Sequence, residues 1–203
     1  YSEKEPGTIY VYERDTLDLH NKISVPYPRY MLSHGNLFVA KYGIEETETG
    51  IAIYDKANGF NQLKSISHGG ANVRTGQPMV DDEYIMVPVS IGASNSMIEV
   101  YSSSAPFGHV KTITLPHGDM NDGGDDDNYV AIATAWYGNH QYVYEKGTWN
   151  LVADIVGPGN GNGIAFYHGE HDYLFNSYHW KHGRPTELHS QGASTFLTAA
   201  IMH

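Results

Sequence analysis

The sequence lacks cysteine entirely, which excludes disulfide bonds, thiolate metal sites and cysteine nucleophiles. No apolar run approaches the roughly 20 residues that a membrane-spanning helix needs, so we expect no membrane insertion. Basic residues are also scarce, with 12 Lys and Arg against 23 Asp and Glu and a net charge of −11. Nucleic-acid binding needs clustered cations, and we therefore expect no nucleic-acid partner.

Several sequence signals of known enzymes are missing as well. There is no Gly-x-Ser-x-Gly nucleophile elbow and no metalloprotease helix motif. A glycine-rich segment at 157–163 leads into an apolar strand pattern, whereas a phosphate loop leads into a helix. The first residues, Tyr1 to Lys4, include neither an initiating methionine nor a signal-peptide pattern. We expect that the chain was processed or cut from a longer one.

Glycine and tyrosine are abundant, with 22 and 16 residues, which favours short strands and frequent turns. One strand pattern recurs and closes on a tyrosine 42, 47 and 43 residues after the previous one, at Tyr12, Tyr54, Tyr101 and Tyr144. A second apolar strand follows each tyrosine after 11 or 12 residues and ends in isoleucine, at Ile23, Ile66, Ile113 and Ile155. We predict that the four tyrosines pack in the core or between sheets.

A third apolar strand and a polar corner precede three of these strand pairs and recur in the last unit, and a further apolar stretch precedes three of the four corners. Units of four strands in about 40–50 residues are typical of propeller blades. The sequence therefore predicts an all-β protein, a β-propeller of about four to five four-stranded antiparallel blades with an incomplete first blade. Its predicted segments are 1–26 (outer strands of the first blade), 27–67, 68–116, 117–157 and 158–203, the last with a strand at 194–201. Residues upstream of Tyr1 or a partner chain would complete the first blade.

The repeat resembles the FG-GAP (integrin-α-like) propeller repeats in Gln141–Glu145 and Gly147–Val152, which are similar to that family's outer two strands. Residues 118–127 resemble its calcium loop. Calcium prefers six to eight oxygen ligands, and the candidate ligands here are Asp119, Asn121, Asp125 and Asp127. Ca²⁺ is accordingly a candidate cofactor. The alternative is an acidic, glycine-rich surface turn without metal.

Two further kinds of site are open. Histidines gather in the last unit and would suit a transition metal, although exposed turns explain them equally: His168, His171, His179, His182 and His189. Corner carboxylates would suit a glycan-active hydrolase, although aspartate is also what such turns prefer: Asp81, Asp82, Asp126, Asp127, Glu170 and Asp172.

Aromatic residues that do not recur with the repeat are the candidate ligand surface: Trp136, Tyr137, Tyr178, His179 and Trp180. Together these features favour a non-catalytic binding or structural scaffold. It would recognise a glycan or a protein, or assemble with itself, as an extracellular, cell-surface or virion component. The alternative is a glycan-active hydrolase that uses the corner carboxylates.

Overall fold

The structure is a computed structural model of residues 1–203. It describes residues 7–44, 48–70, 72–92, 95–116, 119–135, 140–156, 164–167, 172–175, 178–181 and 184–190. These residues form nineteen β-strands and no helix, so none of them belongs to a helix that could cross a membrane. The predicted all-β fold is confirmed. The chain divides into two compact units, residues 1–92 with 99–112 and residues 93–98 with 113–203.

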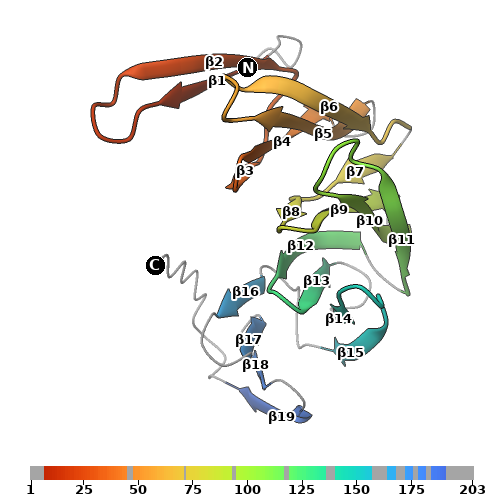
Figure 1. Ribbon diagram of the computed structural model, residues 1–203. Helices are drawn as coiled ribbons and strands as arrows, with labels where there is room; N and C mark the ends of the chain where they lie inside the picture. Colours follow the sequence, from red (N-terminus) through yellow and green to blue (C-terminus); the bar gives the residue numbers. More distant parts are fainter. Residues whose placement is uncertain are drawn as a thin grey trace. The chain divides into compact units, whose positions relative to one another are not determined.

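The first unit begins with a two-stranded antiparallel sheet, β1 (Gly7–Tyr12) and β2 (Leu19–Val25) (Figure 1). A four-stranded sheet follows, with β3 (Met31–His34), β4 (Leu37–Ile44), β5 (Glu48–Asp55) and β6 (Asn61–Ser67) in that spatial order. Consecutive strands pair with their neighbours through short turns, which is the meander expected of a blade.

The third sheet has the same order with an interrupted first strand. Both β7 (Val73–Thr75) and β8 (Met79–Val80) pair with β9 (Tyr84–Ile91), which is followed by β10 (Asn95–Ser102) and β11 (His109–Leu115). The interruption contains Pro78, which has no N–H to donate to a ladder. Strands β10 and β11 include residues of both units.

The second unit contains two further four-stranded antiparallel sheets. Their strands are β12 (Asp119–Asp125), β13 (Tyr129–Ala135), β14 (His140–Glu145) and β15 (Leu151–Val156), then β16 (Ile164–Tyr167), β17 (Asp172–Phe175), β18 (Tyr178–Lys181) and β19 (Arg184–Ser190). The predicted strand at 194–201 lies outside the described residues.

A hydrophobic core joins the first two sheets. Side chains on alternate residues of β1 and β2 pack against β4 and β5 in one cluster of buried residues: Ile9, Ile23, Val25, Ala40, Tyr42, Ala52 and Tyr54. We call the face of a sheet that carries Ile9 and Ile23 its forward face and the opposite face its backward face. The core between the first two sheets is thus formed by the forward face of β1–β2 and the backward face of β3–β6.

The predicted packing of the repeated tyrosines is confirmed at three positions and wrong at one. Tyr54, Tyr101 and Tyr144 are buried, but Tyr12 is 56% exposed. The reason is that Tyr12 lies on the backward face of β1–β2, and none of the described residues covers that face. The local sequence around Tyr12 follows the repeat, but no sheet of the described residues lies against Tyr12.

Candidate functional site

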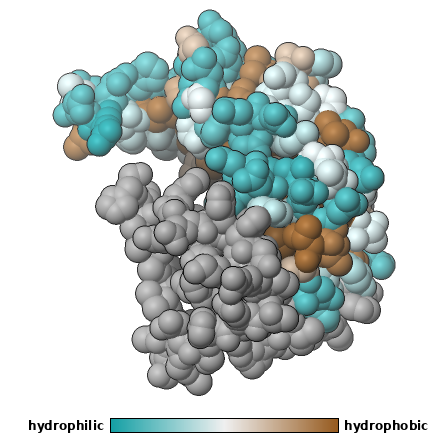
Figure 2. Space-filling view, turned by 60° about the horizontal axis from the view of Figure 1, so that its bottom comes forward, coloured by the Kyte–Doolittle hydropathy of each residue, from teal (hydrophilic) through white to brown (hydrophobic). Residues whose placement is uncertain are grey.

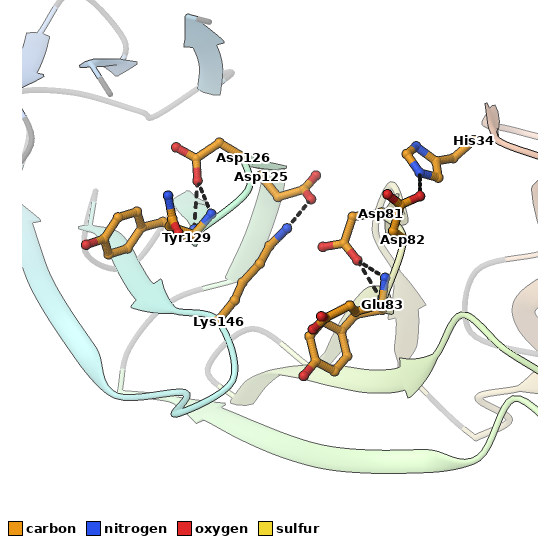
Figure 3. A network of polar contacts seen from close by, with 10 residues as sticks. His34, Asp81, Asp82, Glu83, Asp125, Asp126, Tyr129 and Lys146 are labelled. Carbon is orange, nitrogen blue, oxygen red and sulfur yellow. Dashed lines mark hydrogen bonds and ion pairs between the residues drawn. The ribbon is translucent and has the colours of Figure 1, made fainter. Parts of the chain in front are cut away.

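The polar corners between the first and second strands of the third and fourth sheets share one geometry (Figure 3). In the third sheet, Asp81 Oδ1 accepts hydrogen bonds from the backbone N–H groups of Glu83 (2.8 Å) and Tyr84 (2.6 Å). In the fourth sheet, Asp126 Oδ1 accepts the equivalent bonds from Asn128 (2.8 Å) and Tyr129 (2.7 Å). A carboxylate that closes a turn in this way replaces a backbone acceptor.

In the second, third and fourth sheets, the end of the third strand reaches back to the corner. Two residues beyond Tyr54 and Tyr144, the backbone N–H donates to a corner carbonyl, as Lys56 does to Asn36 (2.9 Å) and Lys146 to Asn128 (2.8 Å), and Ser103 does the same beyond Tyr101. The lysine side chains also reach the corner. Lys56 Nζ donates a hydrogen bond to Ser33 Oγ (2.6 Å). Lys146 Nζ lies 2.7 Å from Asp125 Oδ2, and this ion pair is mostly shielded from solvent. The corners are therefore braced turns.

These contacts bear on the hydrolase alternative. Asp81 and Asp126 occupy equivalent positions and bind equivalent N–H groups, whereas glycoside hydrolysis needs two carboxyl groups with different environments. Asp82 is almost fully exposed, and its Oδ1 lies 2.8 Å from His34 Nε2 of the second sheet. Glu170 lies outside the described residues. The geometry thus gives Asp81 and Asp126 a structural role.

The candidate calcium segment differs from the expected loop. Residues Asp119–Asp125 form strand β12, and its pairing with β13 shifts register between Met120 and Asp122. The carboxylate of Asp125 is bound by the Lys146 ammonium, and Asp127 is exposed in the turn that follows. Among the described residues, no group of three or more His, Cys, Asp or Glu side chains could hold a metal. Calcium binding stays a prediction.

The predicted ligand surface falls partly outside the described residues, because Trp136 and Tyr137 lie in the segment 136–139. The structure places Tyr178, His179 and Trp180 in strand β18. Of the five histidines considered for a transition metal, His189 lies in β19 and His179 in β18, and the other three lie outside the described residues.

The outer turns, which join the third and fourth strands, form a repeat that the sequence analysis missed. In the first four sheets, each outer turn carries one large apolar residue in the left-handed backbone region, at φ 56–59°: Leu17, Phe60, Phe107 and Trp149. This conformation costs an L-residue of order 1–3 kcal/mol, which burial of the side chain can offset. Phe107 and Trp149 are buried, while Leu17 is 73% exposed. An apolar residue five or six positions after each repeated tyrosine was the available signal.

Two of these turns, those with Phe60 and Phe107, dock onto the fourth strand of the preceding sheet. Asn21 Nδ2 in β2 donates to the carbonyl of Gly59 (2.5 Å), next to Phe60. At the equivalent joint, Lys64 Nζ in β6 donates to the carbonyls of Pro106 (2.9 Å) and Phe107 (2.7 Å). Both donors stand two residues before the isoleucine that ends the strand pattern. The forward face of one sheet therefore supplies the hydrogen-bond donor, and the outer turn of the next sheet supplies the carbonyl acceptor.

A half-buried histidine, His68, lies between the second and third sheets. His68 Nε2 is 3.3 Å from the Tyr101 hydroxyl, and the two rings are tilted against each other. Burial lowers the pKa of His68 below 6.5, and the nearby Glu99 carboxylate opposes that shift. Burial, assisted by Glu99, also raises the pKa of Tyr101 to about 12. Both groups are thus held neutral near pH 7.

Exposed apolar side chains concentrate at the first sheet. Six of the eleven large hydrophobic residues that are exposed in the described chain fall between residues 10 and 31: Tyr10, Tyr12, Leu17, Leu19, Tyr30 and Met31. Figure 2 shows one face of the molecule, on which strongly hydrophobic residues form small groups between hydrophilic ones. Four of the six lie on the backward side of β1–β2 and its turn, a face that no other sheet covers within the part of the chain that the structure describes.

The sequence matches no protein family model, and no curated protein matches it. Solved structures do match. KlAtg21, in complex with the coiled-coil of AgAtg16, superposes with a TM-score of 0.64 at 12% identity over 87% of this chain and 58% of that chain. The β-propeller domain of the Trilobed protease from Pyrococcus furiosus gives a TM-score of 0.57 at 11% identity, over 84% of this chain and 58% of that chain.

The fold is a β-propeller. KlHsv2 with loop 6CD replaced by a Gly-Ser linker agrees, with a TM-score of 0.58 at 10% identity over 87% of this chain and 56% of that chain. Identities this low establish the fold alone. This propeller chain spans less than two thirds of the length of the chains that it matches. The FG-GAP resemblance stays a prediction.

Proposed function

We propose that this propeller is a non-catalytic module that binds a protein. The observation that carries the proposal is the concentration of exposed apolar side chains on the backward face of β1–β2, where Tyr10 and Tyr12 are both more than half exposed. Tyrosine supplies a large contact area and a hydroxyl at protein interfaces, and it orders few rotatable bonds on binding. Contiguous exposed apolar surface of this kind marks interaction sites.

The corner chemistry supports the same proposal. Two of the corner aspartates that a hydrolase would need, Asp81 and Asp126, brace turns through their carboxylates, so these two residues contribute to the stability of the scaffold. One propeller of similar structure, KlAtg21, was solved with a coiled-coil partner, which is a precedent for protein binding on this fold. We propose that this chain also binds a protein, through the exposed backward face of β1–β2.

Site-specific photocrosslinking tests the proposal. A photoreactive phenylalanine analogue is placed at Tyr12 and, as a matched control, at Val110, an exposed apolar residue of β11. We expect protein adducts in source extracts from the Tyr12 position and none from the Val110 position. Adducts that a glycosidase removes would favour the glycan alternative. Equal labelling at both positions would contradict a specific protein interface.

A further inference from the structure

The outer turn between β5 and β6 contains the dipeptide Asn58-Gly59, and this turn contacts β2 of the first sheet. The carbonyl of Gly59 accepts a hydrogen bond from Asn21 Nδ2 (2.5 Å). The next residue, Phe60, lies edge-on to the ring of His20, with the ring centroids 6.1 Å apart. The backbone of this turn therefore helps to hold the first sheet against the second.

An asparagine side chain can be attacked by the backbone nitrogen of the residue that follows it in the chain. The nitrogen bonds to Cγ and closes a five-membered ring. The approach is easiest before glycine, because glycine has no Cβ to crowd the reacting atoms. Among the described residues, Asn58 is the only asparagine that precedes a glycine. This turn is thus the place in the described chain where the ring closure meets the least steric hindrance.

The backbone nitrogen of Gly59 is open to solvent. The neighbouring N–H groups of Ala57, Phe60 and Asn61 each donate a hydrogen bond within the turn. In the described chain no hydrogen bond engages the N–H of Gly59, and no atom lies within 4 Å of the position that a Cβ would take there. Asn58 and Gly59 are both exposed. Water and hydroxide can therefore reach the nitrogen and remove its proton.

The amide of Asn58 takes part in closing the turn. Its Nδ2 donates to Asp55 Oδ2, while Asp55 Oδ1 accepts the N–H of Ala57 (2.9 Å). Conversion of the Asn58 amide to a carboxylate removes this donor and leaves a second negative charge beside Asp55. Two adjacent carboxylates repel each other, so the converted turn is less stable than the original one.

We propose that Asn58 is a site of spontaneous deamidation, which loosens the joint between the first and second sheets as the protein ages. The Gly59 nitrogen forms a bond to Cγ of Asn58, the Cγ–Nδ2 bond breaks, and the amide leaves as ammonia with the proton that the nitrogen gave up. Water then opens the cyclic imide. Opening at one carbonyl gives aspartate, and opening at the other gives isoaspartate. This inference goes beyond the proposed function and does not depend on it.

Both products act on the joint. Isoaspartate adds a methylene group to the main chain directly before Gly59, which displaces the carbonyl that Asn21 binds. Aspartate keeps the main chain but repels Asp55, whose backbone carbonyl accepts the N–H of Phe60 (2.8 Å) across the turn. Because the bond from Asn21 crosses between the sheets, we expect β1 and β2 to separate from the second sheet more often after conversion.

Mass spectrometry of the intact chain, aged at mildly alkaline pH and then digested with trypsin, tests the modification. Trypsin releases residues 57–64, which also contain Asn61, an asparagine followed by glutamine and so an internal control. An unaged sample digested in parallel measures the conversion that digestion itself causes. We expect amide-to-acid conversion at Asn58 and none at Asn61. The variant Gly59→Ala should convert roughly tenfold more slowly.

The free peptide of residues 57–64, aged under the same conditions, shows what the sequence does without the fold. If the free peptide converts and the folded chain does not, the turn protects Asn58 and the proposal is wrong. Conversion that is equally fast at Asn58 and Asn61, or that Gly59→Ala leaves unchanged, would also overturn it.

Hydrogen exchange tests the loosening of the joint. The variant Asn58→Asp reproduces one product, and Asn150→Asp makes the same charge change in the outer turn of the fourth sheet. We expect faster amide exchange in β1 and β2 in the Asn58→Asp variant and no change there in the Asn150→Asp variant. Unchanged exchange in Asn58→Asp, or equal acceleration in both variants, would overturn the proposed effect on the joint.

Discussion

Replacing Tyr12 and Tyr144 separately by alanine tests whether the neighbouring sheet decides what a repeated residue contributes to stability. The two tyrosines are the third residues of the same tetrapeptide, because residues 10–13 and 142–145 both read Tyr-Val-Tyr-Glu. Both stand at the same register shift between the third and fourth strands of their sheets. Local sequence and local geometry are therefore matched. The environments differ, since Tyr144 is 4% exposed and Tyr12 is 56% exposed.

The magnitudes follow from burial. Truncating a buried aromatic side chain to alanine costs about 3–5 kcal/mol, since transfer energy is lost and a cavity remains. An exposed strand position loses mainly β-propensity and partial contacts, below about 1 kcal/mol. Burial first, then Tyr142 and Asp154, raises the pKa of Tyr144 to about 12, which agrees with a ring removed from water. We therefore expect Tyr144→Ala to be destabilising by about 2–4 kcal/mol more than Tyr12→Ala.

Urea unfolding followed by circular dichroism measures both variants, with Tyr144→Phe as a control that keeps the buried ring. An ultraviolet titration adds an independent check, because the Tyr144→Phe variant should lack one tyrosine that ionises near pH 12. Equal losses of unfolding free energy in the two alanine variants would refute the reasoning. They would mean that the tetrapeptide acts through its own strand pair and that the covering sheet contributes nothing.

Other expectations follow from the same contacts. Asp81→Ala should cost about 1–3 kcal/mol in urea unfolding because two backbone N–H groups lose a charged acceptor, Asp81→Asn should recover most of that loss, and Asp82→Ala should stay within about 0.5 kcal/mol. Lys64→Met removes both Nζ bonds to the next turn and should cost about 1–2 kcal/mol by the same measurement; an unchanged midpoint would argue against the joint. Since burial lowers the pKa of His68 below 6.5, the unfolded chain takes up its proton first, and stability falls as the pH drops below 6.5. His68→Gln should therefore flatten the loss of unfolding free energy between about pH 7.5 and 5.5. The calcium hypothesis predicts heat on calorimetric titration of the intact chain with CaCl₂ and a weaker response from Asp127→Ala; two flat traces would contradict it.

The sheets could be predicted from the sequence because the spacing of the apolar strands and of the repeated tyrosines depends on strand pairing within each sheet. The preference of aspartate for turns correctly indicated the role of Asp81 and Asp126. The exposure of Tyr12 could not be predicted in this way, because it depends on a surface supplied by another sheet. The left-handed turns were missed for a related reason, since glycine is the usual signal and here Phe60 or Trp149 takes that conformation.

The joints between sheets have a direction, and this direction limits what can bind the first sheet. At the two joints between the first three sheets, an amide or ammonium on a forward face donates to a carbonyl in the next outer turn, as Asn21 does to Gly59 and Lys64 to Phe107. The turn that carries Leu17 has the acceptor geometry and an exposed apolar side chain, so it corresponds to the receiving half of a joint. A partner that covers this turn must present a hydrogen-bond donor beside aliphatic side chains. Because the receiving halves offer carbonyl acceptors, two of them cannot form such a joint with each other. This argues that the exposed face of β1–β2 selects a partner surface unlike itself.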